Sequence, residues 1–185
     1  MSEKPQEKTT FAADCYGFLK TFTALLLVLV ILFPFCQVIT VDGSSMVPTL
    51  EDHDQLFLQK AGYEPEAGDI VVLRKDFAYV TGPIVKRVIA TGGQTVEIDY
   101  NTSIVYVDGQ PIDEPYLGEP MVHPTDPALQ ETSWTVPEGS VFVMGDNRNA
   151  SYDSRHMELG VVDTRHVLGK AVFTLLPLHS IGPIG

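Results

Sequence analysis

Three short polar segments contain the residue types from which nucleophilic and acid–base chemistry can be built. They are residues 43–50 (GSSMVPTL), 84–88 (IVKRV) and 145–155 (GDNRNASYDSR). Each also has an ordinary structural interpretation when taken alone. The first is a serine-containing turn, the second a strand whose lysine extends to solvent, and the third a loop of turn-forming Gly, Asp and Asn. The three segments can take part in one reaction only if the secondary-structure elements that carry them bring them together.

A charge-free apolar run comes directly before the first segment. Residues 21–41 contain no Asp, Glu, Lys or Arg, and about 20 helical residues cover the roughly 30 Å hydrocarbon layer of a membrane. We predict one transmembrane helix over 21–41, after a short segment over 1–20. A cleaved secretory signal peptide fits less well, because its apolar region is usually about 7–15 residues long and ends at a small-residue cleavage site.

The distribution of basic residues predicts the orientation of this helix. Lys4, Lys8 and Lys20 come before the run, and no Lys or Arg follows it until Lys60. Basic residues near a membrane span favour the cytoplasmic side. We therefore expect a single-pass protein of the cell membrane, with a cytoplasmic N-terminus and an extracytoplasmic domain over 42–185.

The domain over 42–185 alternates short apolar, β-branched runs with turn residues, which is typical of strands. The expected strands are 55–58, 69–73, 83–90, 95–98, 104–107, 141–144 and 167–176. Residues 111–137 are rich in Pro, Glu and Asp and are expected to be irregular. We predict a mainly β fold: a small antiparallel β-barrel-like body with an inserted ribbon, preceded by one N-terminal transmembrane helix.

The composition excludes several functions. Twelve Lys and Arg against 24 Asp and Glu give a net charge of −12, which opposes binding to nucleic-acid phosphates. Two cysteines do not build a disulfide framework or a cysteine-rich zinc site. The five histidines show no metal-ligand spacing. We therefore expect no nucleic-acid partner, no metal and no cofactor.

Taken together, the segments resemble the motifs of bacterial type I signal peptidases, membrane-anchored Ser-Lys proteases that remove signal peptides from exported preproteins. The resemblance rests on SMVPTL at 45–50, GDIVV at 68–72, KRV at 86–88 and GDN…SYDSR at 145–155. Their order and spacing are similar to the short, Gram-positive-like forms with one N-terminal span. The resemblance implies a serine endopeptidase that acts on secretory preproteins, with the lipid bilayer and the nearby export translocon as partners.

The resemblance also implies roles for individual residues. Ser45 is the expected nucleophile, which needs a base, and Lys86 is the expected base. A lysine acts as a base only when neutral, and apolar burial lowers its pKa from the ordinary value of about 10.4. By family match, Ser151 hydrogen-bonds Lys86 and orients it. A structural ion-pair cluster is expected from Asp153, Arg87 and Arg155.

Two parts of the expected site remain open in the sequence. The Ser45 backbone N–H is one candidate oxyanion donor, but the residue two positions earlier, a serine in Gram-negative relatives, is Gly43 here. The second donor is therefore not assigned. Similarity to the family's pocket suggests that a substrate pocket is lined by Ile39, Val41, Ile84 and Val85, with ordinary core packing as the alternative for each.

Two other functions are alternatives to this one. A self-cleaving repressor-type protease shares a Ser-Lys pair and a related β fold, but such proteins are cytosolic, and the apolar run argues against that class. A membrane-tethered β domain that binds exported chains without cutting them would be favoured if Ser45 or Lys86 were missing. Both residues are present.

Overall fold

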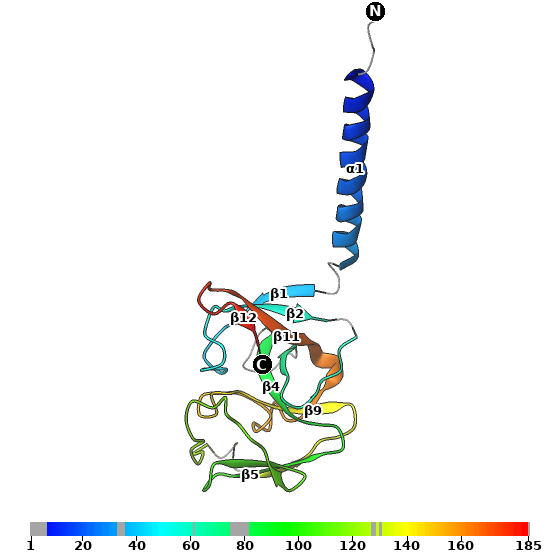
Figure 1. Ribbon diagram of the computed structural model, residues 1–185. Coiled ribbons are helices and arrows are strands. Elements are labelled where there is room, and N and C mark those ends of the chain that lie inside the picture. The colour runs from blue at the N-terminus through cyan, green and yellow to red at the C-terminus, as the bar shows by residue number, and fades with distance from the viewer. Residues whose placement is uncertain are drawn as a thin grey trace, which may run out of the picture. The chain divides into compact units, whose positions relative to one another are not determined.

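The computed structural model describes residues 7–32, 36–60, 62–74, 82–126, 129 and 131–184. The chain divides into two units, Met1–Gln37 and Val38–Gly185, and each is described by itself. The first contains helix α1 (Glu7–Leu32), and strand β1 (Cys36–Thr40) crosses the boundary between the units (Figure 1). Over the described residues, no helix combines the length and the apolar character that a membrane crossing requires.

The helix differs in its bounds from the one predicted over 21–41. It begins earlier, at Glu7, and ends at Leu32, and residues 36–40 are a strand. Pro34, which lies outside the described residues, has no N–H and disfavours helical conformation in the residue before it. The β-branched residues at 38–40 then favour extended chain. The apolar run is therefore divided between a helix and the first strand of the next unit.

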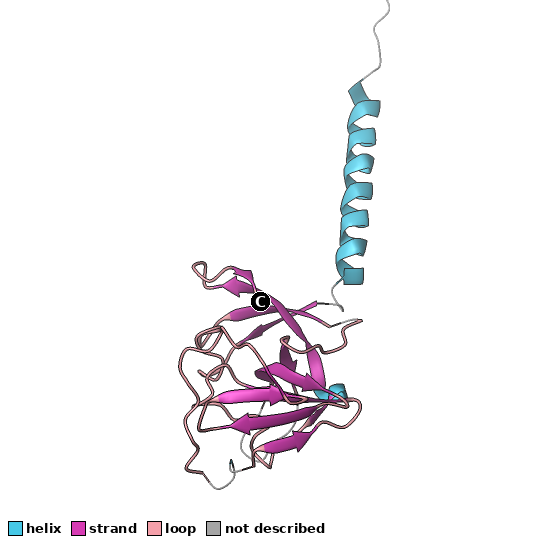
Figure 2. Ribbon diagram, turned by 60° about the horizontal axis from the view of Figure 1, so that its bottom comes forward, coloured by secondary structure: helices cyan, strands magenta, loops and turns pink. Residues whose placement is uncertain are grey.

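The larger sheet contains eight strands. Their order is β1, β2 (Gln55–Gln59), β11 (Val167–Leu176), β3 (Ile70–Leu73), β4 (Ile84–Thr91), β9 (Ser140–Met144) and β10 (Val162–Asp163), with β12 (Gly182–Pro183) paired to β11. Neighbouring strands from β2 to β10 are antiparallel. A short 3₁₀ helix, η3 (Thr164–His166), leads into β11. Figure 1 labels β1, β2, β4, β9, β11 and β12 of this sheet, and Figure 2 shows the strands of the body in magenta.

The smaller sheet is inserted in the sequence between β4 and β9. It contains four antiparallel strands, in the order β7 (Gln110–Pro111), β6 (Ile104–Val107), β5 (Thr95–Asp99) and β8 (Ser133–Thr135). Val96, Val105 and Trp134 of this sheet share an apolar cluster with Ala90 and Phe142 of the larger one. This shared core fixes the inserted sheet to the body.

The prediction of a mainly antiparallel β body with an inserted element is confirmed. Each expected strand overlaps an observed one, from 55–58 in β2 to 167–176 in β11. The larger sheet follows an open path from β1 to β10, so the expected barrel-like body corresponds to a partial barrel. Strand β4 lies between β3 and β9, and residues 85–90 of it are buried. This central position decides the environment of Lys86.

Candidate active site

Lys86 is buried in the middle of β4. It pairs in register with Val71 of β3, and only 3 % of its surface is exposed. Its pKa is lowered to about 8 from the ordinary 10.5, mainly by burial; the negative charges of Asp153 and Asp146 oppose this shift, and the positive charge of Arg155 adds to it. A substantial fraction of this lysine is therefore neutral near physiological pH, as a base requires.

Ser45 lies in a tight turn between β1 and β2. Backbone hydrogen bonds from Val47 N to Ser44 O (3.2 Å) and from Leu50 N to Met46 O (3.0 Å) shape the turn, and the buried side chains of Met46 and Leu50 fix it to the core. Gly43 begins the turn with a φ of +91°. That left-handed conformation favours glycine, which gives a structural reason for the absence of a serine there.

The turn brings Ser45 to the lysine. Lys86 Nζ forms a 2.6 Å hydrogen bond with Ser45 Oγ, and a 2.9 Å bond to the carbonyl oxygen of Val85. A neutral amine at this distance is able to accept the hydroxyl proton. The two residues assigned by resemblance to the roles of nucleophile and base are therefore in direct contact.

The loop that follows β9 packs against this pair. Asn147 N donates a hydrogen bond to the carbonyl oxygen of Ser45, and its side-chain amide donates to that of Ser44. Gly145 lies so close that a Cβ there would overlap the Ser45 carbonyl and the side chain of Ser151. The loop and the turn that carries Ser45 are thus in close contact.

Ser151 differs from the expectation. Its Oγ is buried and has no hydrogen-bond partner among the described residues, so the bond to Lys86 that the family match implies is not formed. Lys86 bonds instead to its own strand, at Val85. The Ser151 hydroxyl is near enough to Asp153 to favour the ionised carboxylate, without reaching hydrogen-bond geometry. It is therefore close to the charged groups of the site but is not paired with the base.

Asp153 and Arg155 form the ion pair that the sequence predicted. The guanidinium contacts both carboxylate oxygens, at 2.8 Å and 2.9 Å, and Gly145 N donates to the same carboxylate at 3.0 Å. Burial alone would raise the pKa of Asp153, but the Arg155 charge and these hydrogen bonds outweigh it and hold the pKa below its ordinary value. This buried negative charge stabilises the ammonium form of Lys86.

Arg87 does not join that pair. The prediction that Asp153, Arg87 and Arg155 form one ion-pair cluster is therefore wrong for Arg87. Arg87 binds Asp146 through two hydrogen bonds, of 2.9 Å and 2.7 Å. It also donates to the carbonyl of Gly68 and lies 3.9 Å from the ring centre of Tyr116. Neighbouring residues of a strand point to opposite faces, so Arg87 and Lys86 face different parts of the loop.

The four expected pocket residues do not lie together. Ile39, Val41 and Val85 belong to one buried apolar cluster with Met46. Ile84 packs instead against a second cluster, which contains Leu73. Alternation along β4 explains the separation of Ile84 from Val85. Of the four, only Ile39, Val41 and Val85 share a cluster with Met46, the residue that follows Ser45.

Two interactions near the site were not expected from the sequence. Arg148 forms a buried ion pair with Glu114, and Asn149 bonds to the 119–122 segment. Residues 111–137 show no hydrophobic period, so nothing in the sequence indicated which part of this segment meets the loop after β9.

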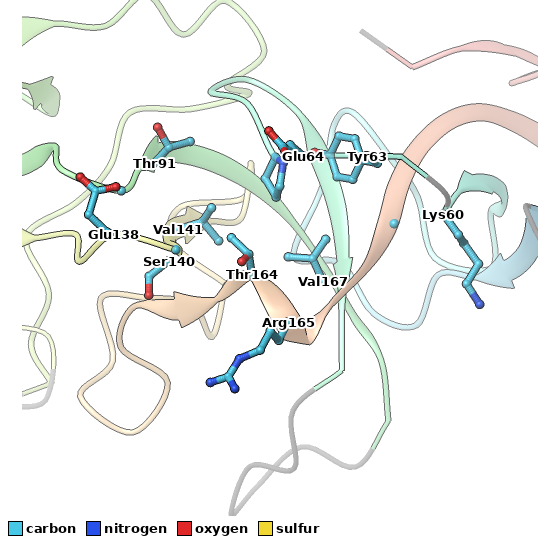
Figure 3. A pocket seen from close by; sticks show the side chains of 14 residues that line it. Lys60, Tyr63, Glu64, Thr91, Glu138, Ser140, Val141, Thr164, Arg165 and Val167 are labelled. Carbon is cyan, nitrogen blue, oxygen red and sulfur yellow. The ribbon is translucent and has the colours of Figure 1, made fainter.

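A cavity lies on the body away from Ser45 and Lys86 (Figure 3). Its volume is about 550 Å³, and its lining includes neither Ser45 nor Lys86. Figure 3 shows Val141, Thr164 and Val167 near its centre and the charged groups of Lys60, Glu138 and Arg165 toward its edges. Within the described part of the chain, no group of three or more His, Cys, Asp or Glu side chains is arranged to hold a metal ion.

The site therefore consists of a turn serine in contact with a buried strand lysine, in a mainly β body. Comparison with known proteins gives the family: the profile described as "Signal peptidase, peptidase S26" matches residues 16–176. The chain therefore belongs to the signal peptidase family, as a bacterial type I signal peptidase. The resemblance stated from the motifs is confirmed, and with it the enzyme class.

Two curated relatives agree with this assignment. The chain is 39 % identical to "Probable signal peptidase I-1" of Synechocystis sp. (strain ATCC 27184 / PCC 6803 / Kazusa), over 88 % of this chain and 82 % of the relative. It is 39 % identical to "Signal peptidase I" of Bacillus amyloliquefaciens, over 76 % and 74 %. A solved signal peptidase I from Enterococcus faecalis V583 is 30 % identical, with a TM-score of 0.46, and the likeness covers 58 % of this chain and 97 % of that one.

Proposed function

We propose that this chain is a membrane-anchored serine endopeptidase that cleaves N-terminal signal peptides from exported preproteins. Ser45 is the nucleophile and Lys86 is the general base. The observation that carries the proposal is the 2.6 Å contact between Lys86 Nζ and Ser45 Oγ, made by a lysine whose burial lowers its pKa to about 8.

The first chemical step forms an ester. The lone pair of neutral Lys86 accepts the hydroxyl proton while Ser45 Oγ attacks the carbonyl carbon of the scissile bond. When the tetrahedral intermediate collapses, the carbon–nitrogen bond breaks and the Lys86 ammonium returns its proton to the leaving amine. Asp153 and Asp146 stabilise that ammonium through their charges. Water then attacks the ester while Lys86 accepts its proton; the bond between the carbonyl carbon and Ser45 Oγ breaks, Lys86 returns the proton to Oγ, and the new C-terminal carboxyl group of the signal peptide is released.

The negative charge that develops on the carbonyl oxygen needs donors. The backbone N–H of Ser45 is adjacent to the nucleophilic oxygen and makes no hydrogen bond within the described residues, so we assign it to this role. Gly43 has no side-chain donor to add. The oxyanion site of this chain therefore depends on backbone or neighbouring groups rather than on a serine at position 43.

The substrate is expected to be an extended preprotein segment with small side chains before the cut. Ile39, Val41 and Val85, which share a cluster with Met46, are our proposed contacts for these side chains. Ile84 faces the second cluster and is not part of this proposal. Backbone edges near the nucleophile would pair with a strand-like substrate.

The location of the chain is also a proposal, and it rests on the sequence. Residues 21–41 carry no charge, Lys20 comes directly before them, and Ser45 follows within a few positions. We propose a cytoplasmic N-terminus and a catalytic domain at the outer membrane surface, near the export translocon. Protease added to intact spheroplasts should then digest residues 42–185, and protection of this domain would contradict the proposed orientation.

Cleavage of a model preprotein tests the activity. The purified chain in detergent should release one product whose new N-terminus, determined by sequencing, is that of the mature protein. Ser45→Ala and Lys86→Met should each lower kcat/KM by about 10³-fold or more, because removing a nucleophile or its base removes most of the catalysis. Ser133→Ala and Lys170→Met, at residues outside the site, are the matched controls.

Two outcomes would reject the assignment. Near-normal cleavage by Ser45→Ala or Lys86→Met would mean that the Ser-Lys pair is not the catalytic group. Binding of the preprotein with equal affinity by wild type and both variants, without any product, would instead favour the domain that binds exported chains without cutting them.

A further inference from the structure

A smaller pocket lies against the turn that carries Ser45 and has no role in the mechanism above. Its volume is about 230 Å³, and it is lined by Val47, Pro48, Gly118, Glu119, Asp146 and Asn147. Two of these residues are tied directly to the nucleophile's turn: Asn147 N bonds to the Ser45 carbonyl at 3.0 Å, and Val47 N bonds to that of Ser44 at 3.2 Å. The pocket therefore begins within two residues of Ser45.

The far wall of the pocket is held in place by Asn149. Its side-chain amide donates to Glu119 Oε1 at 2.8 Å and to the carbonyl of Pro120 at 3.0 Å, and it accepts from Val122 N at 2.9 Å. The two walls also approach closely, because a Cβ added at Gly118 would lie 3.3 Å from Pro48 Cδ. The pocket is thus formed between two fixed segments of the chain.

The position of the pocket indicates which part of a substrate it meets. A bound polypeptide extends in both directions from the scissile bond at Ser45. The residues proposed to contact the side before the cut, Ile39, Val41 and Val85, lie in one cluster, and none of them lines this pocket. We propose that the pocket binds a side chain among the first two residues after the cut, an inference that rests on the proposed signal-peptide cleavage.

The charges around the pocket predict its preference. Asp146 is neutralised by two hydrogen bonds from Arg87, whereas Glu119 is exposed and bonded to the neutral amide of Asn149. The six lining residues include no Lys, Arg or His. One uncompensated negative charge therefore remains at the rim. It disfavours an acidic side chain and accepts a neutral or basic side chain of moderate size.

The size of this preference follows from ordinary surface electrostatics. Exposed charge pairs contribute up to about 1 kcal/mol, which corresponds to about fivefold in kcat/KM. Screening by salt reduces such an effect. We expect a preference for Lys over Glu of about three- to fivefold at low salt, smaller at high salt.

A matched preprotein series tests the charge. The substrates carry Ala, Lys or Glu at the first or at the second residue after the cut, and kcat/KM is measured for wild type, Glu119→Gln and Glu97→Gln. Glutamine keeps the acceptor for Asn149, and Glu97 is an exposed glutamate on β5. Glu119→Gln should bring the Lys-to-Glu ratio close to one at a single position, whereas Glu97→Gln should keep the wild-type ratio.

A second variant tests the role of the pocket's volume independently of the charge of Glu119. Gly118→Val should slow cleavage of a substrate with Leu at the selected position several-fold more than cleavage of one with Ala, because the pocket is narrowed against Pro48. A Lys-to-Glu ratio that Glu119→Gln leaves unchanged, or a charge preference at residues before the cut, would overturn the inference. If the proposed function itself were wrong, wild type would cut none of the substrates, which is a different result.

Discussion

The backbone N–H of Asn147 donates a 3.0 Å hydrogen bond to the carbonyl oxygen of Ser45. The Asn147 side chain adds a 3.2 Å bond to the carbonyl of Ser44. The turn that holds Ser45, the proposed nucleophile, is therefore fixed by a loop about a hundred positions later in the sequence. The position of Ser45 Oγ relative to Lys86 depends on how closely this loop is able to approach.

Gly145→Ala should separate the loop from the nucleophile. A Cβ at Gly145 would overlap the Ser45 carbonyl and the side chain of Ser151, so one of these segments must move. A displacement of about 1 Å in a catalytic group costs about 10²-fold in rate, and overpacking costs about 1–3 kcal/mol in unfolding free energy. We expect both losses, measured as kcat/KM on a preprotein and by chemical unfolding.

Gly182→Ala is the matched control for that variant. No heavy atom lies within 4 Å of a Cβ built there, and its φ is not in the left-handed region, so activity and stability should stay close to those of wild type. Retention of activity within twofold by Gly145→Ala would show that the loop does not need to approach so closely.

The rate of cleavage should depend on pH through Lys86. Burial lowers the pKa of this residue to about 8, and only the neutral amine accepts the Ser45 proton. The kcat/KM measured from pH 6 to 10 should therefore rise through an apparent pKa near 8 and level off above it. A profile that is flat over this range, or one that rises only toward the ordinary lysine value of 10.5, would contradict a buried lysine as the base.

The strands of the body were predictable because their signal is local. Runs of β-branched residues between turn residues are enough to place β2, β4 and β11, and the apolar neighbours of Lys86 indicate that its strand is buried. The contact between Ser45 and Lys86 is different. Nothing in the local pattern joins two residues 41 positions apart, and only the resemblance to a family predicted it.

The partners of the charged residues were the least predictable part of the site. Arg87 was expected beside Asp153 but binds Asp146, because adjacent side chains on a strand face opposite ways. The expected hydrogen bond of Ser151 to Lys86, which is not formed, also depends on side-chain placement that the motif alone does not specify. In the helix, the bounds differed because Pro34 and the β-branched residues after it favour the end of the helix before the apolar run ends.

The buried pair of Arg148 and Glu114 should contribute strongly to stability. The side chain of Arg148 is fully buried and that of Glu114 nearly so. Removing one partner of such a pair leaves a buried charge without compensation and costs about 3–5 kcal/mol. Glu114→Ala should therefore lower the unfolding free energy by about that amount, measured by denaturant unfolding.

Glu97→Ala provides the comparison for Glu114→Ala. Glu97 is exposed on β5, and surface substitutions of this kind change stability by about 0.5 kcal/mol or less. Equal effects of the two substitutions would mean that the pair at Glu114 contributes no more than an exposed residue.

The burial that lowers the pKa of Lys86, the proposed base, should cost stability, and the cost should depend on pH. An unfolded lysine keeps its proton up to about pH 10.5, whereas the folded one loses it above about pH 8. Between these values the unfolded chain binds more protons, so this residue makes folding stability rise with pH. Below pH 8 the full penalty applies, of the order of 3 kcal/mol. Lys86→Met, which has no such proton, should therefore be more stable than wild type at pH 7, and its advantage should shrink as the pH rises toward 10.

Unfolding free energies of both proteins over pH 7–10 measure the difference, since the other titrating groups largely cancel. Ser45→Ala, which retains the lysine, should follow the wild-type dependence. A constant difference between wild type and Lys86→Met would mean that the pKa of Lys86 is not lowered in the folded protein.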